Sequence, residues 1–251
     1  MSRAWTSPHG LEPDVCGAAE LGPGQANNLT CWRHVGDCGA GRASIARVKR
    51  RPIIAVIGVD GAGKSTQAQL LADWLSGQGT PASYFENAGG RPTINRLARR
   101  LGRRDGPDLF GAGYVGLESS VRWLAIARAL LISRATGRIA IMDRYSYCQY
   151  AVMRARADPG ERRARVAFSI FPTPDIVCLL AVPALVAQAR VEQRGRDSEE
   201  LGYLSAFAHA YRSLPEADTF QTIDASGSPA QVQAALREAV APVLHLSAAR
   251  R

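Results

Sequence analysis

The stretch Gly58-Val-Asp-Gly-Ala-Gly-Lys-Ser65 decides the fold, because it follows an apolar run at 53–57 and precedes an amphipathic helical pattern. It matches G-x-x-x-x-G-K-[ST] without a gap, and a position between a strand and a helix makes that match specific. Glycines at 58, 61 and 63 let the backbone turn its N–H groups inward, next to the positive end of the helix. The stretch therefore predicts a phosphate-binding loop.

The side chains and amides of this loop have distinct expected tasks. Lys64 would place a positive charge on the β- and γ-phosphates of a bound triphosphate, and the Ser65 hydroxyl would be a ligand of Mg²⁺. Contacts with the phosphates are expected from Gly58, Gly61, Ala62, Gly63, Lys64, Ser65 and Thr66. ATP and Mg²⁺ are the expected cofactors.

The remainder of the chain from Arg51 alternates short apolar runs with longer helical patterns, which is typical of a parallel sheet covered on both faces. The expected strands are 53–57, 82–85, 139–142, 176–182 and 220–223. Apolar stripes of two expected helices are formed by Leu70, Leu71, Trp74 and Leu75, and by Val232, Leu236, Val240, Val243 and Leu244. We predict an α/β protein with a P-loop NTPase fold and a five-stranded parallel sheet with helices on both faces.

The segment 117–136 is apolar nearly all round, so we expect the core to cover one side of this helix and a partner subunit the other. Residues 1–50 show neither helical nor strand periodicity, and we expect a flexible N-terminal extension before a nucleotide-binding domain at 51–251. Cys16, Cys31 and Cys38 lie in that extension, but their spacing does not match the paired pattern of structural zinc sites.

The formal charge of +9 is compatible with a nucleic acid, a membrane surface or a polyanionic small molecule as the partner. No basic stretch is interleaved with aromatic residues, so no nucleic acid is expected. No run approaches the roughly 18 apolar residues of a membrane span, and the first 20 residues lack the apolar core of a signal peptide. We therefore expect a cytoplasmic protein that does not bind a membrane.

Two further charged sequences point to phosphoryl transfer. Asp143-Arg144-Tyr145 follows an apolar strand, where Asp143 could hold Mg²⁺ and the planar fork of Arg144 could bind a phosphate. The arginine-dense stretch around Arg194 and Arg196, near 190–200, is typical of a lid that excludes water and neutralises charge in the transition state. A salt bridge at the end of the strand and a solvated basic helix end are the corresponding structural alternatives.

The sequences VIGVDGAGKSTQAQLLADWL, LAIAR, IAIMDRY, PDIVCLL and RVEQRGRD together resemble the thymidylate kinase family over 52–244. The resemblance implies ATP-Mg as the phosphoryl donor, dTMP as the acceptor, and a homodimer packed through helices. By position, it implies that Asp60 interacts with Mg²⁺ and the acceptor phosphate and that Arg144 binds phosphate. It also implies that Arg194 or Arg196 is the catalytic arginine of the lid. It also assigns Arg128 and Tyr145 to the acceptor site, with Leu124 replacing the family's stacking phenylalanine and Trp123 beside it.

Departures from the family pattern lie on the acceptor side. Glu86-Asn-Ala-Gly-Gly-Arg91 stands where the family has REPGGT, and Ala151-Val152-Met153 stands where it has Ala-Tyr-Gln. Glu86 is where a deoxynucleoside kinase keeps a general base, so a kinase for a nucleoside or another hydroxyl acceptor is the alternative function. A nucleotide-binding protein with impaired catalysis is a second alternative.

Overall fold

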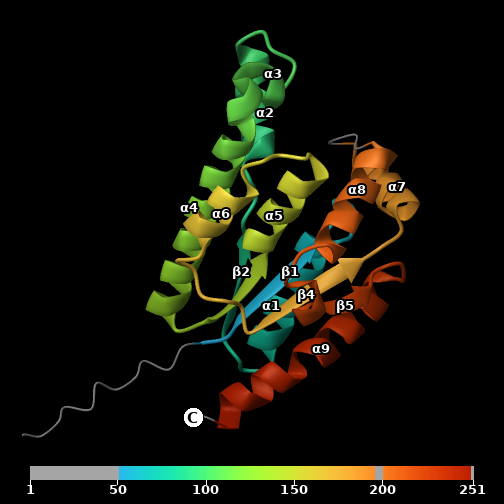
Figure 1. The fold of residues 1–251 in the computed structure, drawn as a ribbon. Helices are drawn as coiled ribbons and strands as arrows, with labels where there is room; N and C mark the ends of the chain where they lie inside the picture. Colours follow the sequence, from blue (N-terminus) through green and yellow to red (C-terminus); the bar gives the residue numbers. More distant parts are fainter. Residues whose placement is uncertain (1–50, 196–199, 250–251) are drawn as a thin grey trace, which may run out of the picture. The chain divides into compact units, whose positions relative to one another are not determined.

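The computed structural model describes residues 51–195 and 200–249, apart from the side chains of Pro92, Ala112 and residues 246–249 (Figure 1). The expected extension at 1–50 and the lid residue Arg196 lie outside the described residues. In this part of the chain no helix is long and apolar enough to cross a membrane.

Five strands form one sheet in the order β2-β3-β1-β4-β5, and every neighbouring pair is parallel. The strands are β1 Ile53–Gly58, β2 Ala82–Glu86, β3 Ile139–Asp143, β4 Ile176–Ala181 and β5 Gln221–Asp224. The predicted α/β fold with a five-stranded parallel sheet is confirmed, with strand ends shifted by one residue where they differ. The central strand β1 is buried along its whole length, as expected for an uninterrupted apolar run.

Helices cover both faces of this sheet. They are α1 Lys64–Gly77, α2 Arg91–Arg100, α3 Gly106–Phe110, α4 Tyr114–Thr136, α5 Ser146–Ala155, α6 Glu161–Phe168, α7 Ala184–Arg194, α8 Leu201–Arg212 and α9 Pro229–Ala249, with short 3₁₀ turns at Gly111–Gly113 and Ala217–Thr219. Helices α1 and α9 pack together on one face, whereas α4, α5 and α8 lie on the other (Figure 1).

The amphipathic stripes of two helices follow the sequence pattern closely. Leu71 and Leu75 of α1 are buried, and so are Val232, Leu236 and Val240 of α9. Leu70 is an exception with 40% of its surface exposed, because one residue along a helix turns the side chain by about 100°. The periodicity therefore placed the two helices correctly against the sheet.

Helix α4 differs from its expected character. Its buried face contains Ile126 and Leu130 but also the charged residues Glu118 and Arg122, while Leu124 and Leu131 are 62% and 65% exposed. A helix that is apolar nearly all round is therefore not what the structure shows. Two charged side chains on a buried helix face require polar partners, and these partners form part of the site described next.

All five strands end at the same edge of the sheet because they are parallel. β1 leads into the phosphate loop, β2 ends at Glu86, and β3 ends at Asp143 and pairs with both β1 and β2. The loops that follow Gly58, Glu86 and Asp143 therefore meet at one edge of the sheet, although up to 85 positions separate these residues in the sequence.

Candidate active site

The loop after β1 has the backbone conformation that a phosphate-binding loop needs. Gly58, Gly61 and Gly63 have φ angles of 147°, 88° and 87°, which side-chain-bearing residues rarely adopt. A Cβ atom at Gly61 would lie 2.2 Å from the carbonyl oxygen of Ala187 in α7. Glycine is therefore required at 61 both for the turn of the loop and for its close approach to α7.

Lys64 is buried at the start of α1 and its ammonium group is directed back into the loop. Its Nζ donates to the Val59 carbonyl oxygen at 2.7 Å and lies 3.5 Å from Oδ1 of Asp60. Burial and the nearby Arg144 lower the pKa of Lys64, and the charges of Asp60 and Asp143 act in the opposite direction. The loop thus holds a lysine beside its own inward-facing backbone.

Asp60 and Arg144 form an ion pair between the loop and the end of β3. Arg144 has a φ of 75°, which is uncommon for a residue with a side chain, and its Nη2 donates to Oδ1 of Asp60. Burial by itself would raise the pKa of Asp60, but the charges of Arg144, Lys64 and Arg91 hold it well below its usual range. Asp60 is therefore ionised at neutral pH, and Arg144 is fixed at the mouth of the loop.

Asp143 lies beside the loop and is contacted by two hydroxyl groups. Ser65 Oγ donates to Oδ2 of Asp143 at 2.5 Å, and the Tyr84 hydroxyl donates to the same atom at 3.1 Å. Oδ1 of Asp143 is buried and has no hydrogen-bond partner among the described residues. A serine hydroxyl and a carboxylate with a free oxygen are the ligands that Mg²⁺ prefers, so these residues fit the ion.

Tyr84 was not anticipated from the sequence. Burial raises the pKa of its hydroxyl, and the negative charges of Asp143 and Glu86 raise it further, so Tyr84 stays a hydrogen-bond donor at neutral pH. The available signal was its position two residues before Glu86, which puts both side chains on the same face of β2.

A cavity of about 370 Å³ opens beside these residues. One part of its wall, the phosphate-loop side, is formed by Asp60, Ser65 and Arg144. Another part, the α4 side, is formed by Glu118 and Arg122 of α4 with Gly89 and Arg91. Glu86, Val152, Val191, Arg194 and Phe207 also line the cavity.

The α4 side is a cluster of charged groups around Glu118 and Arg122, whose side chains are 3% and 2% exposed. Oε1 of Glu118 accepts from Arg122 Nη2 at 3.2 Å, and Oε2 accepts from Arg156 Nη1 at 3.3 Å. Arg91 Nη2 lies 4.0 Å from Oε1 of Glu118, and Arg122 Nε donates to Oε1 of Gln149 at 3.0 Å. Helices α2, α4 and α5 thus each contribute to one polar cluster, of which Arg91, Glu118 and Arg122 line the cavity.

The structure brings together most of the predicted site residues. Asp60, Ser65, Glu86, Arg144 and Arg194 line the cavity. Lys64 and Asp143 contact these lining residues directly, and Thr66 is exposed in the first turn of α1. The phosphate and metal contacts assigned to them remain predictions.

Three predicted acceptor residues on α4 do not line the cavity. Trp123 donates from Nε1 to the Ala167 carbonyl oxygen at 2.9 Å and packs on Phe171, while Leu124 and Arg128 are exposed. Position 128 is six residues beyond Arg122, a rotation of about 240° around the helix axis, so its side chain leaves on another face. The helix arginine that reaches the cavity is Arg122, and Glu118 takes the position four residues before it.

Tyr145 is buried beneath the site. Its hydroxyl donates to the Pro172 carbonyl oxygen at 2.7 Å, and its side chain does not belong to the cavity wall. Glu118 and Arg122 were missed, although two oppositely charged residues one helical turn apart were a signal that could have found them.

The parallel sheet, the glycine loop with its lysine, and the serine–aspartate pair together define a P-loop nucleotide kinase. A search of sequence families agrees, because the family described as "Thymidylate kinase" matches residues 56–236. The chain therefore belongs to the thymidylate kinase family.

Individual relatives are similar over much of the chain. The probable thymidylate kinase of Archaeoglobus fulgidus is 29% identical over 200 residues, which cover 77% of this chain and 97% of the relative. The probable thymidylate kinase of Thermococcus onnurineus is 32% identical over 157 residues, covering 58% and 74%. The thymidylate kinase of Ectopseudomonas mendocina is 28% identical over 190 residues, covering 72% and 90%.

Proposed function

We propose that the protein transfers the γ-phosphoryl group of ATP to dTMP, giving ADP and dTDP. The observation that carries this proposal is the single cavity whose wall contains both phosphate-loop residues and the arginines Arg91, Arg122 and Arg144. Membership of the thymidylate kinase family supports dTMP as the acceptor. The geometry supports a reaction between two phosphate-bearing molecules that meet at the carboxyl edge of the sheet.

The reaction needs positioning and charge stabilisation more than proton transfer. The inward-facing amides of the loop and Lys64 would bind the β- and γ-phosphates of ATP. An oxygen of the dTMP phosphate, ionised at neutral pH because its second pKa is about 6, attacks the γ-phosphorus while the bond to the leaving ADP oxygen breaks. Arg144, held by Asp60, would bind the transferring or accepting phosphate.

Ser65 and Asp143 would hold Mg²⁺, which when bound neutralises charge on the β- and γ-phosphates. Tyr84 keeps the Asp143 carboxylate oriented through its hydrogen bond. Arg194, at the end of α7 in the cavity wall, would serve as a lid arginine, and Arg196 two residues further along the chain is the other candidate.

One observation favours the alternative of a hydroxyl acceptor. Glu86 lines the cavity, where a carboxylate could take the proton of a nucleoside hydroxyl. The third function, nucleotide binding without transfer, would leave the arginines of the cavity wall without a catalytic use.

A panel of nucleosides and nucleoside monophosphates, assayed for ADP release with ATP and Mg²⁺, separates these functions. We expect turnover with dTMP and much less with thymidine. Turnover with thymidine but not with dTMP would establish the hydroxyl kinase, and ATP binding without turnover of any acceptor would establish impaired catalysis.

We also infer a homodimer, supported by the exposed apolar residues Leu124 and Leu131 of α4. Light scattering of the full chain should give twice the mass of one chain. The Leu131→Arg variant should give the mass of a single chain. The cytoplasmic location remains a prediction from the sequence.

A further inference from the structure

Glu118 is an unusual residue for the wall of a nucleotide cavity. Its side chain is only 3% exposed, it lines the cavity, and three arginine side chains surround its carboxylate. A buried carboxylate is tolerated only when it is paired and hydrogen-bonded, and Arg91, Arg122 and Arg156 supply the pairing. The question is whether the carboxylate only holds the arginines or also contacts the substrate.

The hydrogen bonds of Glu118 leave part of its capacity unused. An ionised carboxylate has about four lone-pair positions. Within the described residues Glu118 accepts one hydrogen bond from Arg122 and one from Arg156, while Arg91 at 4.0 Å is too far for a hydrogen bond. A carboxylate that lines a cavity with unused acceptor positions is suited to a ligand that brings an N–H or O–H donor.

The neighbours of Glu118 have unused donors as well. Nη1 of Arg122 and Nε2 of Gln149 are buried and have no hydrogen-bond partner among the described residues. Val152 and Phe207 add apolar surface to the same cavity. Gln149 does not line the cavity, but Glu118 as an acceptor, Arg122 as a donor and these apolar side chains do, and together they match a flat heterocycle whose edge carries both N–H and C=O groups.

The direction of the acceptor follows from the reaction. The accepting phosphate must reach the phosphate-loop side, where the γ-phosphoryl group would lie, so the rest of the acceptor extends toward the remaining wall of the cavity. The α4 side is part of that wall. The base of the acceptor would therefore meet Glu118 and Arg122.

We propose that Glu118 is a specificity-determining residue whose carboxylate accepts a hydrogen bond from the ring N–H of the acceptor base. This inference rests on the proposed function. Thymine has such a group, N3–H, between two carbonyl oxygens, and Arg122 is adjacent to donate to a carbonyl. A base analogue without this N–H leaves a buried carboxylate unsatisfied and is rejected.

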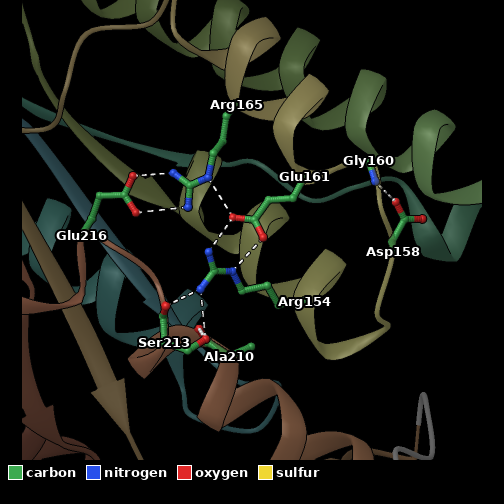
Figure 2. A network of polar contacts seen from close by, with 8 residues as sticks. All are labelled: Arg154, Asp158, Gly160, Glu161, Arg165, Ala210, Ser213 and Glu216. Atoms are coloured by element: carbon green, nitrogen blue, oxygen red, sulfur yellow. Dashed lines mark hydrogen bonds and ion pairs between the residues drawn. The ribbon is translucent and has the colours of Figure 1, made fainter.

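A second glutamate of the chain provides a matched control. Glu161 in α6 is also held between arginines: Arg154 donates to it from Nε at 2.7 Å and Nη2 at 2.9 Å, and Arg165 from Nε at 2.8 Å (Figure 2). Glu161 does not line the cavity. Its replacement removes an arginine-paired carboxylate without touching the acceptor.

The test compares dTMP with N3-methyl-dTMP in the wild-type chain and in Glu118→Ala, Glu118→Gln and Glu161→Gln. We expect kcat/KM of the wild type to be at least about tenfold lower for the methylated analogue. Glu118→Ala removes the carboxylate and makes room for the methyl group. In this variant the kcat/KM values for dTMP and N3-methyl-dTMP should differ by less than about threefold. Glu161→Gln should keep the wild-type ratio.

Glu118→Gln keeps the shape of the side chain and covers the case in which the alanine variant does not fold. Its neutral amide oxygen is a weaker acceptor than a carboxylate, and Arg122 and Arg156 compete for it, so KM for dTMP should rise about tenfold, with kcat and ATP affinity changed much less. Equal use of both substrates by the wild type, full discrimination in Glu118→Ala, or an unchanged KM in Glu118→Gln would each overturn the role of Glu118. Absence of wild-type turnover with dTMP would instead overturn the proposed function.

Discussion

The two sides of the cavity are built in different ways. On the phosphate-loop side, Asp60, Lys64 and Ser65 come from one short loop, and Arg144 and Asp143 from the end of the adjacent strand. On the α4 side, Glu118 meets arginines from α2, from α4 itself and from the segment after α5. The first side is fixed by the backbone of one short loop and by the pairing of β1 with β3, whereas the second depends on how three helices pack.

This difference separates a general function from a specific one. Every nucleoside triphosphate presents the same phosphate tail, so a loop of backbone amides and one lysine serves any of them. Acceptors differ in their base and sugar, and recognising them requires side chains that converge from separate elements. Substitutions on the phosphate-loop side should therefore change kcat and the dependence of the rate on Mg²⁺. Substitutions on the α4 side should change KM for the acceptor.

The largest effect is expected for Lys64→Ala. Loss of the ammonium group should lower kcat by about a thousandfold, because a preorganised charge at the transferring phosphate is removed. ADP release in a coupled assay measures this, and circular dichroism checks that the fold is retained. Turnover near the wild-type rate would show that the loop does not bind the donor phosphates.

Tyr84→Phe should sharpen the assignment of Asp143 to the metal. Without the hydroxyl that contacts Oδ2, the carboxylate loses one of its two orienting hydrogen bonds. The Mg²⁺ concentration for half-maximal rate should rise about tenfold, while KM for dTMP stays within about twofold. An altered KM with unchanged Mg²⁺ dependence would place Tyr84 in acceptor binding.

Gly89→Ala tests the packing of the α4 side. A Cβ atom at 89 would lie 2.3 Å from Cγ of Glu118, so the glutamate must move. KM for dTMP should rise about tenfold, since small displacements of positioning groups weaken productive binding. Gly116→Ala is the matched control, because a Cβ atom there meets nothing within 4 Å. Equal KM values in both variants would disprove the dependence on Glu118 packing.

Glu86→Gln should have little effect on a monophosphate kinase, with kcat/KM for dTMP changed less than about threefold. An ionised phosphate oxygen needs no base, whereas loss of a general base typically costs about 10² to 10⁴ in rate. A loss above about a hundredfold would support the hydroxyl kinase.

The smallest effect concerns stability outside the cavity. Burial would raise the pKa of Glu161, but hydrogen bonds from Arg154 and Arg165 lower it below its ordinary value. Folding therefore stabilises the ionised carboxylate of Glu161. Its stabilisation is present at neutral pH and is lost as the pH falls below about 4.5, the ordinary value. Glu161→Gln should lower the free energy of unfolding by about 1 kcal/mol at pH 7, without changing activity. Denaturant titrations at pH 7 and in acid measure this; equal losses at both would exclude the ion pairs as the cause.

Much of the fold was readable from the sequence because its signals are local. The apolar run at 53–57, the glycine loop and the strand before Asp143 each predict their structure within a few residues, and the five strands were found where expected. The phosphate-loop side was predicted for the same reason. Trp123, Leu124 and Arg128 were assigned to the acceptor site by the family resemblance, but they do not line the cavity, because the face of α4 turned toward it carries Glu118 and Arg122.

The sequence by itself determined a parallel α/β sheet with a loop for a triphosphate, since covalent neighbours and simple periodicities define both. Only the tertiary structure decided which face of α4 reaches the cavity and that Arg122 on this face donates a hydrogen bond to Gln149 of α5. The physical reason is that Arg122 and Gln149 lie 27 residues apart, so their contact exists only once α4 and α5 have packed together.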